Sequence, residues 1–419
     1  MKILYVLDSF YPKIDGPAIV INNISSILNS SKLADVDVLV PKYPKYTDKF
    51  PFKVIRCKSI PATEGYRAGL PLLHHNLNKI LKQENYDIIH IHSPFTIGKY
   101  AQNFGKKHNI PVINTVHTCY ELDFKRKLKS KLLQNFMMNY IEKVINKSDY
   151  ITTVSKGFGL QLISDTYKCR KNVGIIRNAT EFKDTDLSAE IEKLKEKHNI
   201  KNEFLFLFVG RVVENKNIQF SLECLKKLKE SGFKNFKFLI VGEGDYSSKL
   251  SELAREYNLS DNIIFTGVIR DRQVLGAYYK MCHLFLFPSL FDTCGIVALE
   301  AASFGLSSFM IEGTCAGELI EDGKNGFVSP ADSSIWAERL AEIVKDRKQI
   351  ASMKEYTRKS LCKSWEDIAI EYFDLYKRVL LLQSIKNSKK GINIKIIDLK
   401  PAKKKSGIYH IYNVMVKHK

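Results

Sequence analysis

The stretch MCHLFLFPSLFDTCGIVALEAASFG (residues 281–305) places a short apolar run, a turn and a helical pattern in direct succession. The apolar run ends at Pro288 and predicts a buried strand, and residues 296–304 predict a helix rich in Ala and Leu. A buried strand that leads through a turn into a helix is the repeating unit of a parallel sheet with crossover helices. This stretch therefore indicates an α/β fold.

Apolar runs of the same kind recur along the chain at intervals that fit alternating strands and helices. The first half contains KILYVL, DVDVLV, KVIRCK, DIIHIH, PVINTVHT, YITTVS and VGIIRN. A polar stretch follows around residues 181–202, and the runs resume as FLFLFVG, KFLIVG, NIIFTG, HLFLFPS, SSFMIEG and GFVSP. We predict two tandem Rossmann-like, doubly wound domains, residues 1–180 and 181–365. The two should face a cleft, because such sheets bind ligands beyond the carboxyl ends of their strands.

The last part of the chain differs in pattern from both domains. Residues 366–385 predict a helix with an apolar stripe, which we expect to cross back to the first domain. Residues 386–419 are rich in lysine and contain INIKIIDLK and GIYHIYNVMVK as candidate short strands. We interpret residues 386–419 as a basic tail and not as a third domain.

The charge of the chain favours anionic partners. It has 419 residues with 65 Lys and Arg against 45 Asp and Glu, a formal net charge of +20. A nucleotide, a nucleic acid and an acidic lipid surface all fit this balance. Because the chain shows neither a basic stretch interleaved with aromatic residues nor a nucleic-acid reading motif, we expect no nucleic-acid partner.

Cysteine usage and hydropathy bear on the compartment. Eight cysteines occur without a C-x-x-C pair, and no histidines stand at zinc spacing, which favours reduced thiols and no metal site. No apolar run approaches the roughly 20 residues that cross a bilayer, and MKILYVLDSFYPKIDG at the beginning reads as a strand and a loop without a cleavage site. We therefore expect a cytoplasmic protein.

Two carboxylates stand out in the stretch quoted first. Asp292 and Glu300 lie among small and apolar side chains, and Glu300 shares a helix face with Ile296 and Phe304. An ionised carboxylate without a partner would cost several kcal/mol there, so each should be paired or should bind a ligand. The alternative is that Asp292 or Thr293 caps the helix and that Glu300 emerges at an edge.

A basic pair follows the first strand of the second half. The segment GRVVENKN sets Gly210, Arg211 and Lys216 at a strand end just before a helix. An arginine and a lysine five residues apart can converge on one anion, and a diphosphate is the obvious candidate. A solvated basic turn is the alternative. Gly242 in VGEGDY follows the next strand and allows close backbone approach, although a lone G-x-G is a weak signal.

The first half offers two further candidates at strand ends. Gly16, in SFYPKIDGPA, stands in a loop that could bring backbone N–H groups to a phosphate. His117 ends the strand in INTVHTCY and is either a satisfied core residue or a cleft residue. His90 and His92 share one face of their strand, and we interpret both as structural.

No metal clamp is evident in the sequence. The two D-x-D matches, residues 35–37 and 184–186, begin a strand and lie in the expected linker, so neither fits a metal–diphosphate site. We infer that Arg211 and Lys216 neutralise leaving-group charge in place of a cation. The expected cofactor is therefore none.

Several motifs in one order carry a family resemblance. FVGRVVENKN, IVGEGD, FPSLFDTCGIVALEAASFG and EGTCAGELIEDGKNGF, after TVHT and TTVS, resemble the GT-B retaining glycosyltransferases of family 4 over residues 1–382. The resemblance implies an acceptor-side first domain and a nucleotide-sugar-binding second domain. It further implies metal-independent transfer of a sugar, with a UDP-sugar as the expected donor, to a hydroxyl acceptor with retention of configuration.

The resemblance also assigns roles to residues. The segment from Asp292 to Glu300 matches the E-x7-E element, in which the first carboxylate holds hydroxyls of the donor sugar and the second binds the ribose. Amides at the beginning of the helix would bind the diphosphate together with Arg211 and Lys216, and His117 would contact the transferred sugar. The implied catalytic residues are His117, Arg211, Lys216 and Asp292. The implied donor-binding residues are Gly16, Gly210, Arg211, Lys216, Gly242, Asp292, Thr293, Cys294, Gly295, Ile296, Val297 and Glu300.

Three departures from the family pattern put the identity of the donor sugar in doubt. Asp292 replaces the usual Glu, which shortens its reach by about 1.5 Å, one C–C bond. Cys294 stands where Phe is common, and the first loop has Asp-Gly in place of a Gly pair. VHTCYELDF and GYRAGLP are similar to segments of members that glycosylate membrane lipids.

A basic, amphipathic segment raises the question of a membrane surface. Residues 123–145 predict one helix whose apolar stripe is Leu128, Leu132, Phe136, Tyr140 and Val144. Basic residues crowd its predicted beginning, where positive charge opposes the helix macrodipole: Lys125, Arg126, Lys127, Lys129 and Lys131. One interpretation is peripheral attachment to an anionic membrane on its cytoplasmic face, with a lipid or lipid-linked glycan as acceptor. The other is that the stripe packs on the first sheet while the basic residues face water.

Two further functions remain alternatives. A GT-B nucleotide-sugar epimerase would share the donor site but would need additional acid and base residues in the cleft. A basic nucleic-acid-binding protein would account for the charge alone.

Overall fold

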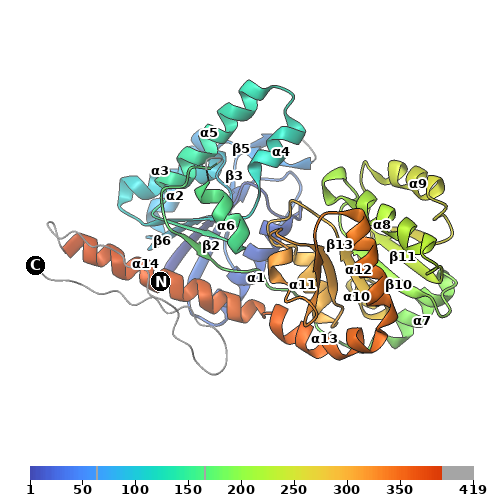
Figure 1. Ribbon diagram of the computed structural model, residues 1–419. Coiled ribbons are helices and arrows are strands. Elements are labelled where there is room, and N and C mark those ends of the chain that lie inside the picture. Colours follow the sequence, from blue (N-terminus) through green and yellow to red (C-terminus); the bar gives the residue numbers. More distant parts are fainter. Residues whose placement is uncertain (63–64, 165–166, 389–419) are drawn as a thin grey trace, which may run out of the picture.

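The computed structural model describes residues 1–62, 65–164 and 167–388. It contains two large sheets in which the hydrogen-bonded strands run parallel, connected by crossover helices (Figure 1). The prediction of two Rossmann-like, doubly wound domains is confirmed. Every apolar run named above that falls in the first half forms a strand of the first sheet.

The order of the first sheet is β3-β2-β1-β6-β7-β8-β9, so the chain changes direction across the sheet between β1 and β6. Its strands are β1 (Lys2–Val6), β2 (Asp35–Pro41), β3 (Val54–Cys57), β6 (Ile88–Ile91), β7 (Val112–Val116), β8 (Tyr150–Thr153) and β9 (Val173–Ile175). A separate antiparallel pair is formed by β4 (Ser59–Pro61) and β5 (Arg67–Gly69).

Both faces of this sheet are covered. Successive side chains of a strand point to opposite faces, so a strand buried on both sides contributes to two clusters. In β1, Ile3 and Tyr5 belong to one buried cluster, and Leu4 and Val6 belong to another. The helical segments of this domain are α1 (Gly16–Ser30), η2 (Pro71–Leu73), α2 (Leu77–Gln83), α3 (Thr96–His108), α4 (Tyr120–Lys127), α5 (Lys131–Lys147) and α6 (Lys156–Ile163).

The second sheet has the order β12-β11-β10-β13-β14-β15 and reverses between β10 and β13. All six side chains of β10 are buried, as expected for the continuous apolar run FLFLFV in a sheet covered on both faces. The strands are β10 (Phe204–Val209), β11 (Phe236–Val241), β12 (Ile263–Gly267), β13 (Leu284–Phe287), β14 (Ser308–Ile311) and β15 (Gly326–Ser329).

The helices of the second domain share one buried core with its sheet, in which the ring of Trp336 stacks on Phe309 at 3.8 Å between centroids. The helical segments are α7 (Ser188–Lys197), η3 (Glu214–Lys216), α8 (Ile218–Glu230), α9 (Ser247–Glu256), α10 (Arg272–Met281), α11 (Ile296–Ser303), η4 (Gly317–Leu319), α12 (Ser333–Lys345) and α13 (Arg347–Leu361).

The last described helix, α14 (Trp365–Ser388), leaves the second domain and packs against α1 in the first (Figure 1). Tyr372, Tyr376 and Val379 are buried in the same cluster as residues of β1 and β2. The predicted helix 366–385 lies within α14, and the predicted boundary at residue 180 falls between β9 and α7. The two candidate strands of the basic tail lie outside the described residues.

The single helix predicted for residues 123–145 is wrong, because the chain forms α4 and α5 with a break between them. Leu128 has extended backbone, and the hydroxyl of Ser130 caps α5 by accepting a hydrogen bond from the N–H of Leu133. Lys125, Arg126 and Lys127 therefore occupy the last turn of α4, where positive charge complements the helix carbonyls. The argument that these three residues oppose a macrodipole is wrong as well. Lys129 lies in the break and Lys131 begins α5.

The apolar stripe of this segment runs from solvent into the core. Leu132 and Phe136 are 82% and 65% exposed, whereas Val144 is fully buried. The described helices include none with the length and apolarity to span a bilayer.

Candidate active site

The predicted site residues follow strands that flank the reversal points of the two sheets or lie next to the flanking strands. Gly210 and Arg211 follow β10, and Asp292 to Gly295 follow β13, its neighbour across the reversal. In the first domain, Gly16 begins α1 and His117 directly follows β7. The sequence order of strands therefore brings the candidates to the carboxyl ends of both sheets.

Two contacts join the candidate residues of the two domains. The hydroxyl of Thr293 donates a hydrogen bond of 2.8 Å to the backbone oxygen of His117. A Cβ atom added to Gly16 would lie 3.7 Å from the side chain of Ile296 at the beginning of α11. The prediction that Gly16 stands in a loop is wrong, because Gly16 is the first residue of α1. The beginning of α1 thus meets the predicted diphosphate-binding end of α11.

Lys216 and Asp292 form an ion pair. The Nζ atom of Lys216 lies 2.7 and 2.6 Å from the two carboxylate oxygens of Asp292, and both side chains are mostly buried. Lys216 also lies 5.5 Å from the ring centre of Phe287. Arg211, one turn away, is exposed and forms no ion pair with any described residue. The site therefore has one cation paired to a carboxylate and one cation facing solvent.

Gly295 is the N-cap residue that directly precedes α11. Its φ of +65° lies in the left-handed region, and a Cβ there would approach the ring of Phe287 to 3.2 Å, so glycine is favoured. No side chain caps this helix, which means that the alternative in which Asp292 or Thr293 is the cap is wrong. The first N–H groups of α11, from Ile296 and Val297, keep the positive end of the helix available for an anion.

Cys294 faces inward, away from the polar groups of the site. It is buried in a small cluster with Val154 and Leu299. Burial raises the pKa of the Cys294 thiol to about 11, so the thiol is neutral at ordinary pH. Its side chain can shape the site but brings no charge to it.

Gly210 and Gly242 approach each other at the ends of β10 and β11. The N–H of Gly210 bonds to the oxygen of Val241, and the N–H of Val212 bonds to the oxygen of Glu243. A Cβ on Gly242 would lie 1.9 Å from the oxygen of Gly210, which no structure tolerates. The close approach predicted for VGEGDY is therefore to the neighbouring strand end that carries Arg211.

Glu300 is mostly buried and has two polar neighbours that the sequence did not single out. The Tyr279 hydroxyl donates to its Oε2 atom at 2.8 Å, and a guanidinium nitrogen of Arg272 lies 4.0 Å from Oε1. Burial raises the pKa of Glu300, while Tyr279 and Arg272 act in the opposite direction. Both neighbours belong to α10. The sequence signal for them is an arginine and a tyrosine seven residues apart, a spacing that places both on one face of a helix.

Glu318, which belongs to the motif EGTCAGELIEDGKNGF and for which the sequence predicts no role, joins the two domains. Its two carboxylate oxygens accept from the N–H groups of Lys156 and Gly157, at 2.8 and 2.6 Å, at the beginning of α6. A Cβ on Gly157 would lie 3.1 Å from both Glu318 and Cys315. Glu318 thus binds the positive end of a first-domain helix, an effect invisible without the fold.

Two family models match the chain in succession. "Glycosyltransferase Family 4" matches residues 15–181, and "Glycosyl transferases group 1" matches residues 190–360. Together they span most of the chain and divide it near the predicted domain boundary. The chain belongs to the group 1, family 4 glycosyltransferases.

Relatives of this glycosyltransferase carry more specific names. The alpha-monoglucosyldiacylglycerol synthase of Acholeplasma laidlawii is 27% identical over 349 residues, which cover 78% of this chain and 84% of that protein. The synthase of the same name from Streptococcus pneumoniae is 28% identical and covers 73% and 70%. A GDP-mannose-dependent alpha-mannosyltransferase of Corynebacterium glutamicum is 25% identical and covers 91% and 90%.

Solved structures share the GT-B fold of this glycosyltransferase. Sucrose-phosphate synthase from Thermosynechococcus elongatus superposes with a TM-score of 0.74 at 19% identity, over 91% of this chain and 99% of that chain. HepE of Anabaena in complex with UDP-glucose superposes with a TM-score of 0.65 at 17% identity, over 93% and 99%.

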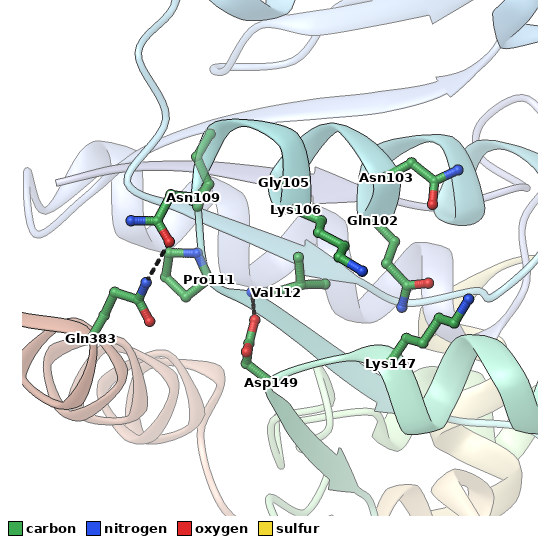
Figure 2. Close-up of a pocket in the computed structure, with 11 residues that line it drawn as sticks. Gln102, Asn103, Gly105, Lys106, Asn109, Pro111, Val112, Lys147, Asp149 and Gln383 are labelled. Atoms are coloured by element: carbon green, nitrogen blue, oxygen red, sulfur yellow. Dashed lines mark hydrogen bonds between the residues drawn. The ribbon is translucent and has the colours of Figure 1, made fainter. Parts of the chain in front are cut away.

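A cavity of about 280 Å³ in the first domain is separate from these residues. It is lined by Val112, which begins β7, whereas His117 follows the other end of that strand. Figure 2 shows Lys106 and Lys147 at this cavity. These lysines stand in the last turns of α3 and α5, where they complement helix carbonyls. Because the cavity and His117 lie at opposite ends of β7, the cavity does not extend the glycosyltransferase site.

Proposed function

We propose that this glycosyltransferase moves a sugar from a nucleotide diphosphate donor, with a UDP-sugar as the expected donor, to a hydroxyl of a membrane lipid or lipid-linked glycan, with retention of configuration. The observation that carries the donor part is the cation arrangement at the end of β10. Lys216 is held on Asp292, Arg211 faces solvent, and the uncapped beginning of α11 lies beside them.

A diphosphate would give these groups their chemistry. The Arg211 guanidinium and the α11 amides can each bind phosphate oxygens, and Lys216 can turn from Asp292 to the same anion. Release from Lys216 would leave the Asp292 carboxylate free to accept hydrogen bonds from sugar hydroxyls. Charge that develops on the leaving diphosphate would then be neutralised by side chains and helix amides, without a metal ion.

The acceptor part rests on the relatives and on one surface. Two relatives are named for the synthesis of a glucosylated diacylglycerol. The segment α4–α5 exposes Leu132 and Phe136 beside basic side chains, a combination that suits an anionic bilayer. We propose that this surface attaches the enzyme peripherally to the cytoplasmic face of a membrane, where a lipid hydroxyl reaches the cleft.

Donor choice is tested first by binding. Thermal shifts with UDP, GDP, ADP and CMP sugars should show stabilisation by UDP-sugars, since a ligand that binds only the folded state raises its stability. Stabilisation by GDP-mannose alone would move the donor to the GDP class, as in the Corynebacterium relative. No stabilisation by any sugar nucleotide would reject the proposed donor class.

Transfer is tested with the donor found in that screen. A radiolabelled sugar should enter the organic phase of vesicles that contain diacylglycerol, and NMR of the product should show the anomer of the donor. Asp292→Asn should abolish incorporation while a surface variant, Lys249→Ala, retains it. Activity should persist after exhaustive EDTA treatment. Loss that manganese or magnesium restores would reject metal independence, and transfer only to soluble acceptors would reject the lipid part.

A further inference from the structure

His117 rests on a second histidine beneath the site. Nδ1 of His92 lies 2.9 Å from Nε2 of His117, and the two rings are nearly parallel, with 5.2 Å between centroids. Both residues are buried. The inference below rests on the proposed function, in which His117 contacts the transferred sugar.

The two outer nitrogens of this pair have different surroundings. Nε2 of His92 is fully buried and has no hydrogen-bond partner. Nδ1 of His117 also has no partner among the described residues, but it is not one of the fully buried unpaired atoms, so it is the nitrogen that a ligand or solvent reaches.

A single N–H···N hydrogen bond joins the two rings at neutral pH. Burial lowers the pKa of His117 to about 4 and the pKa of His92 well below its usual value, so both rings are neutral. A neutral imidazole carries one N–H, and the contact between Nδ1 and Nε2 needs one donor and one acceptor. Two arrangements satisfy this condition.

The two arrangements differ in what Nε2 of His92 carries, an N–H or only a lone pair, at a buried position without a partner. If His117 donates from Nε2, His92 must carry its proton on Nε2, where no acceptor lies. If His92 donates from Nδ1, its Nε2 keeps only a lone pair, and the proton of His117 moves to Nδ1. Buried N–H groups without an acceptor are rarer in proteins than buried acceptors without a donor. The second arrangement is therefore favoured.

We propose that His92 is a positioning residue that donates its Nδ1–H to Nε2 of His117, so that His117 presents an N–H on Nδ1 to an oxygen of the transferred sugar. In this state His117 is a hydrogen-bond donor in the cleft. It has no free nitrogen lone pair there, and so it does not act as a general base.

The neighbouring ring reinforces this state. The ring of His90 lies against that of His92 at a tilt of 35°, with 4.1 Å between centroids. Its own nitrogens are engaged, Nδ1 with the Tyr376 hydroxyl at 2.8 Å and Nε2 with the Thr115 hydroxyl at 2.7 Å. His90 therefore offers no acceptor to Nε2 of His92. Because Tyr376 belongs to α14, the helix that crosses back, the seating of α14 also holds the stack in place.

The tautomer is measured directly on the full chain. In protein labelled with ¹⁵N-histidine at pH 7, two-bond ¹H–¹⁵N correlations distinguish a protonated Nδ1 from a protonated Nε2. The signals of His117 are identified by their loss in His117→Gln. Protonation of His117 at Nδ1 and of His92 at Nδ1 supports the inference. Protonation of His117 at Nε2 overturns it, whether or not the enzyme transfers a sugar.

Kinetics separate positioning from mere support of the fold. His92→Phe keeps the ring without a donor, whereas His92→Asn can place an amide N–H near the former Nδ1. We expect kcat to fall by about tenfold or more in His92→Phe and by no more than about threefold in His92→Asn, with the Kd for UDP within about twofold in both. Equal kcat in both variants overturns the positioning role. If the parent binds no sugar nucleotide, the proposed function fails, and the NMR result still decides the tautomer.

Discussion

At the scale of the residue, the candidate site is characterised by which of its charged side chains are paired with each other. Asp292 is neutralised by Lys216, and Arg211 has no such partner among the described residues. Removal of Arg211 should therefore take away a proposed diphosphate-binding charge with no cost to the fold, whereas removal of Lys216 should also leave a mostly buried carboxylate unpaired. The two substitutions should separate binding from stability.

We expect Arg211→Ala and Lys216→Ala each to lower kcat/KM by at least about tenfold, which corresponds to about 1.4 kcal/mol of transition-state stabilisation. Only Lys216→Ala should also lower the unfolding midpoint in urea. Lys249→Ala, which removes an exposed lysine of α9, is the control for a loss of positive charge. Parental turnover in both site variants would disprove the diphosphate assignment.

A substitution of Glu300 should weaken binding of the nucleotide and not of the sugar. Because Tyr279 already donates to Oε2, the Oε1 atom remains for a ribose hydroxyl. We expect Glu300→Gln to weaken UDP binding by about tenfold, the value of one hydrogen bond to a charged group. Calorimetric titration with UDP and with uridine should show the same loss. A variant that binds UDP normally yet unfolds more easily would assign Glu300 to the fold alone.

At the scale of the element, the glycines after β10 and β11 explain why the segments GRVVENKN and VGEGDY lie side by side. Gly242 and Gly244 permit hydrogen bonds that hold the loop of Arg211 against the next strand end. The predicted strand–turn–helix pattern located both loops. It gave no indication that the glycines face backbone, because the register of β10 and β11 is a property of the pair of strands.

Gly242→Ala should unfold more easily than its matched control. Gly232 also has a positive φ, +103° against +135°, but open space surrounds its missing Cβ. The difference between the two alanine variants therefore isolates the clash with Gly210. We expect Gly242→Ala to lose at least about 2 kcal/mol more unfolding free energy than Gly232→Ala in urea titrations. Equal losses would show that the loops separate without cost.

The break between α4 and α5 changes what the basic segment can do. Three basic residues now stabilise the end of α4, and the exposed apolar residues lie on the first turns of α5. A bilayer would be contacted by apolar side chains on one helix and by charge gathered around the break. Sequence periodicity alone merged the two helices because an apolar residue recurs every four positions across the break.

Cosedimentation with vesicles tests this surface. The parent should pellet with vesicles that contain anionic lipid at low salt and be released at high salt. Leu132→Ser with Phe136→Ser should weaken binding at both salt concentrations, and changing the five basic residues to Gln should abolish the salt dependence. Leu160→Ser with Ile163→Ser, two exposed apolar residues of α6, is the control. A parent that stays in the supernatant at low salt would contradict the membrane interpretation.

At the scale of the whole molecule, the sequence predicted the two domains because buried parallel strands are continuous apolar runs, and such runs need no partner to be recognised. It predicted the strand-end candidates for the same reason. It did not predict Tyr279, Arg272, Glu318 or the contact between His92 and His117. Each of these depends on which helix or strand packs beside another, which is a tertiary property.

The buried histidines should make stability depend on pH. The pKa values of His90 and His92 are well below their usual range and that of His117 is about 4, so the unfolded chain binds more protons than the folded chain between about pH 6.5 and 4. Stability should therefore fall as the pH drops from 7.5 to 5.5, with a limiting slope of about 1.4 kcal/mol per pH unit for each of these groups.

Urea midpoints at pH 7.5, 6.5 and 5.5 measure this slope. Burial raises the pKa values of Glu300 and Asp8, and this opposes the trend, because the folded chain then binds protons more readily at these two groups than the unfolded chain does. His92→Phe should show a shallower slope than the parent, because one of the three groups is gone. Midpoints that do not change between pH 7.5 and 5.5 would contradict the burial of neutral histidines.

The path of α14 has a consequence for synthesis on the ribosome. The core of the first domain includes Trp365, Tyr372 and Val379, which are translated after the whole of the second domain. Domains commonly fold in the order in which they emerge, but here the second domain can complete its core while the first still lacks α14. Nascent chains stalled so that α13 has left the exit tunnel while α14 is still inside it should therefore carry a protease-resistant second domain and a protease-sensitive first domain. Resistance of both should appear only when α14 has left the exit tunnel.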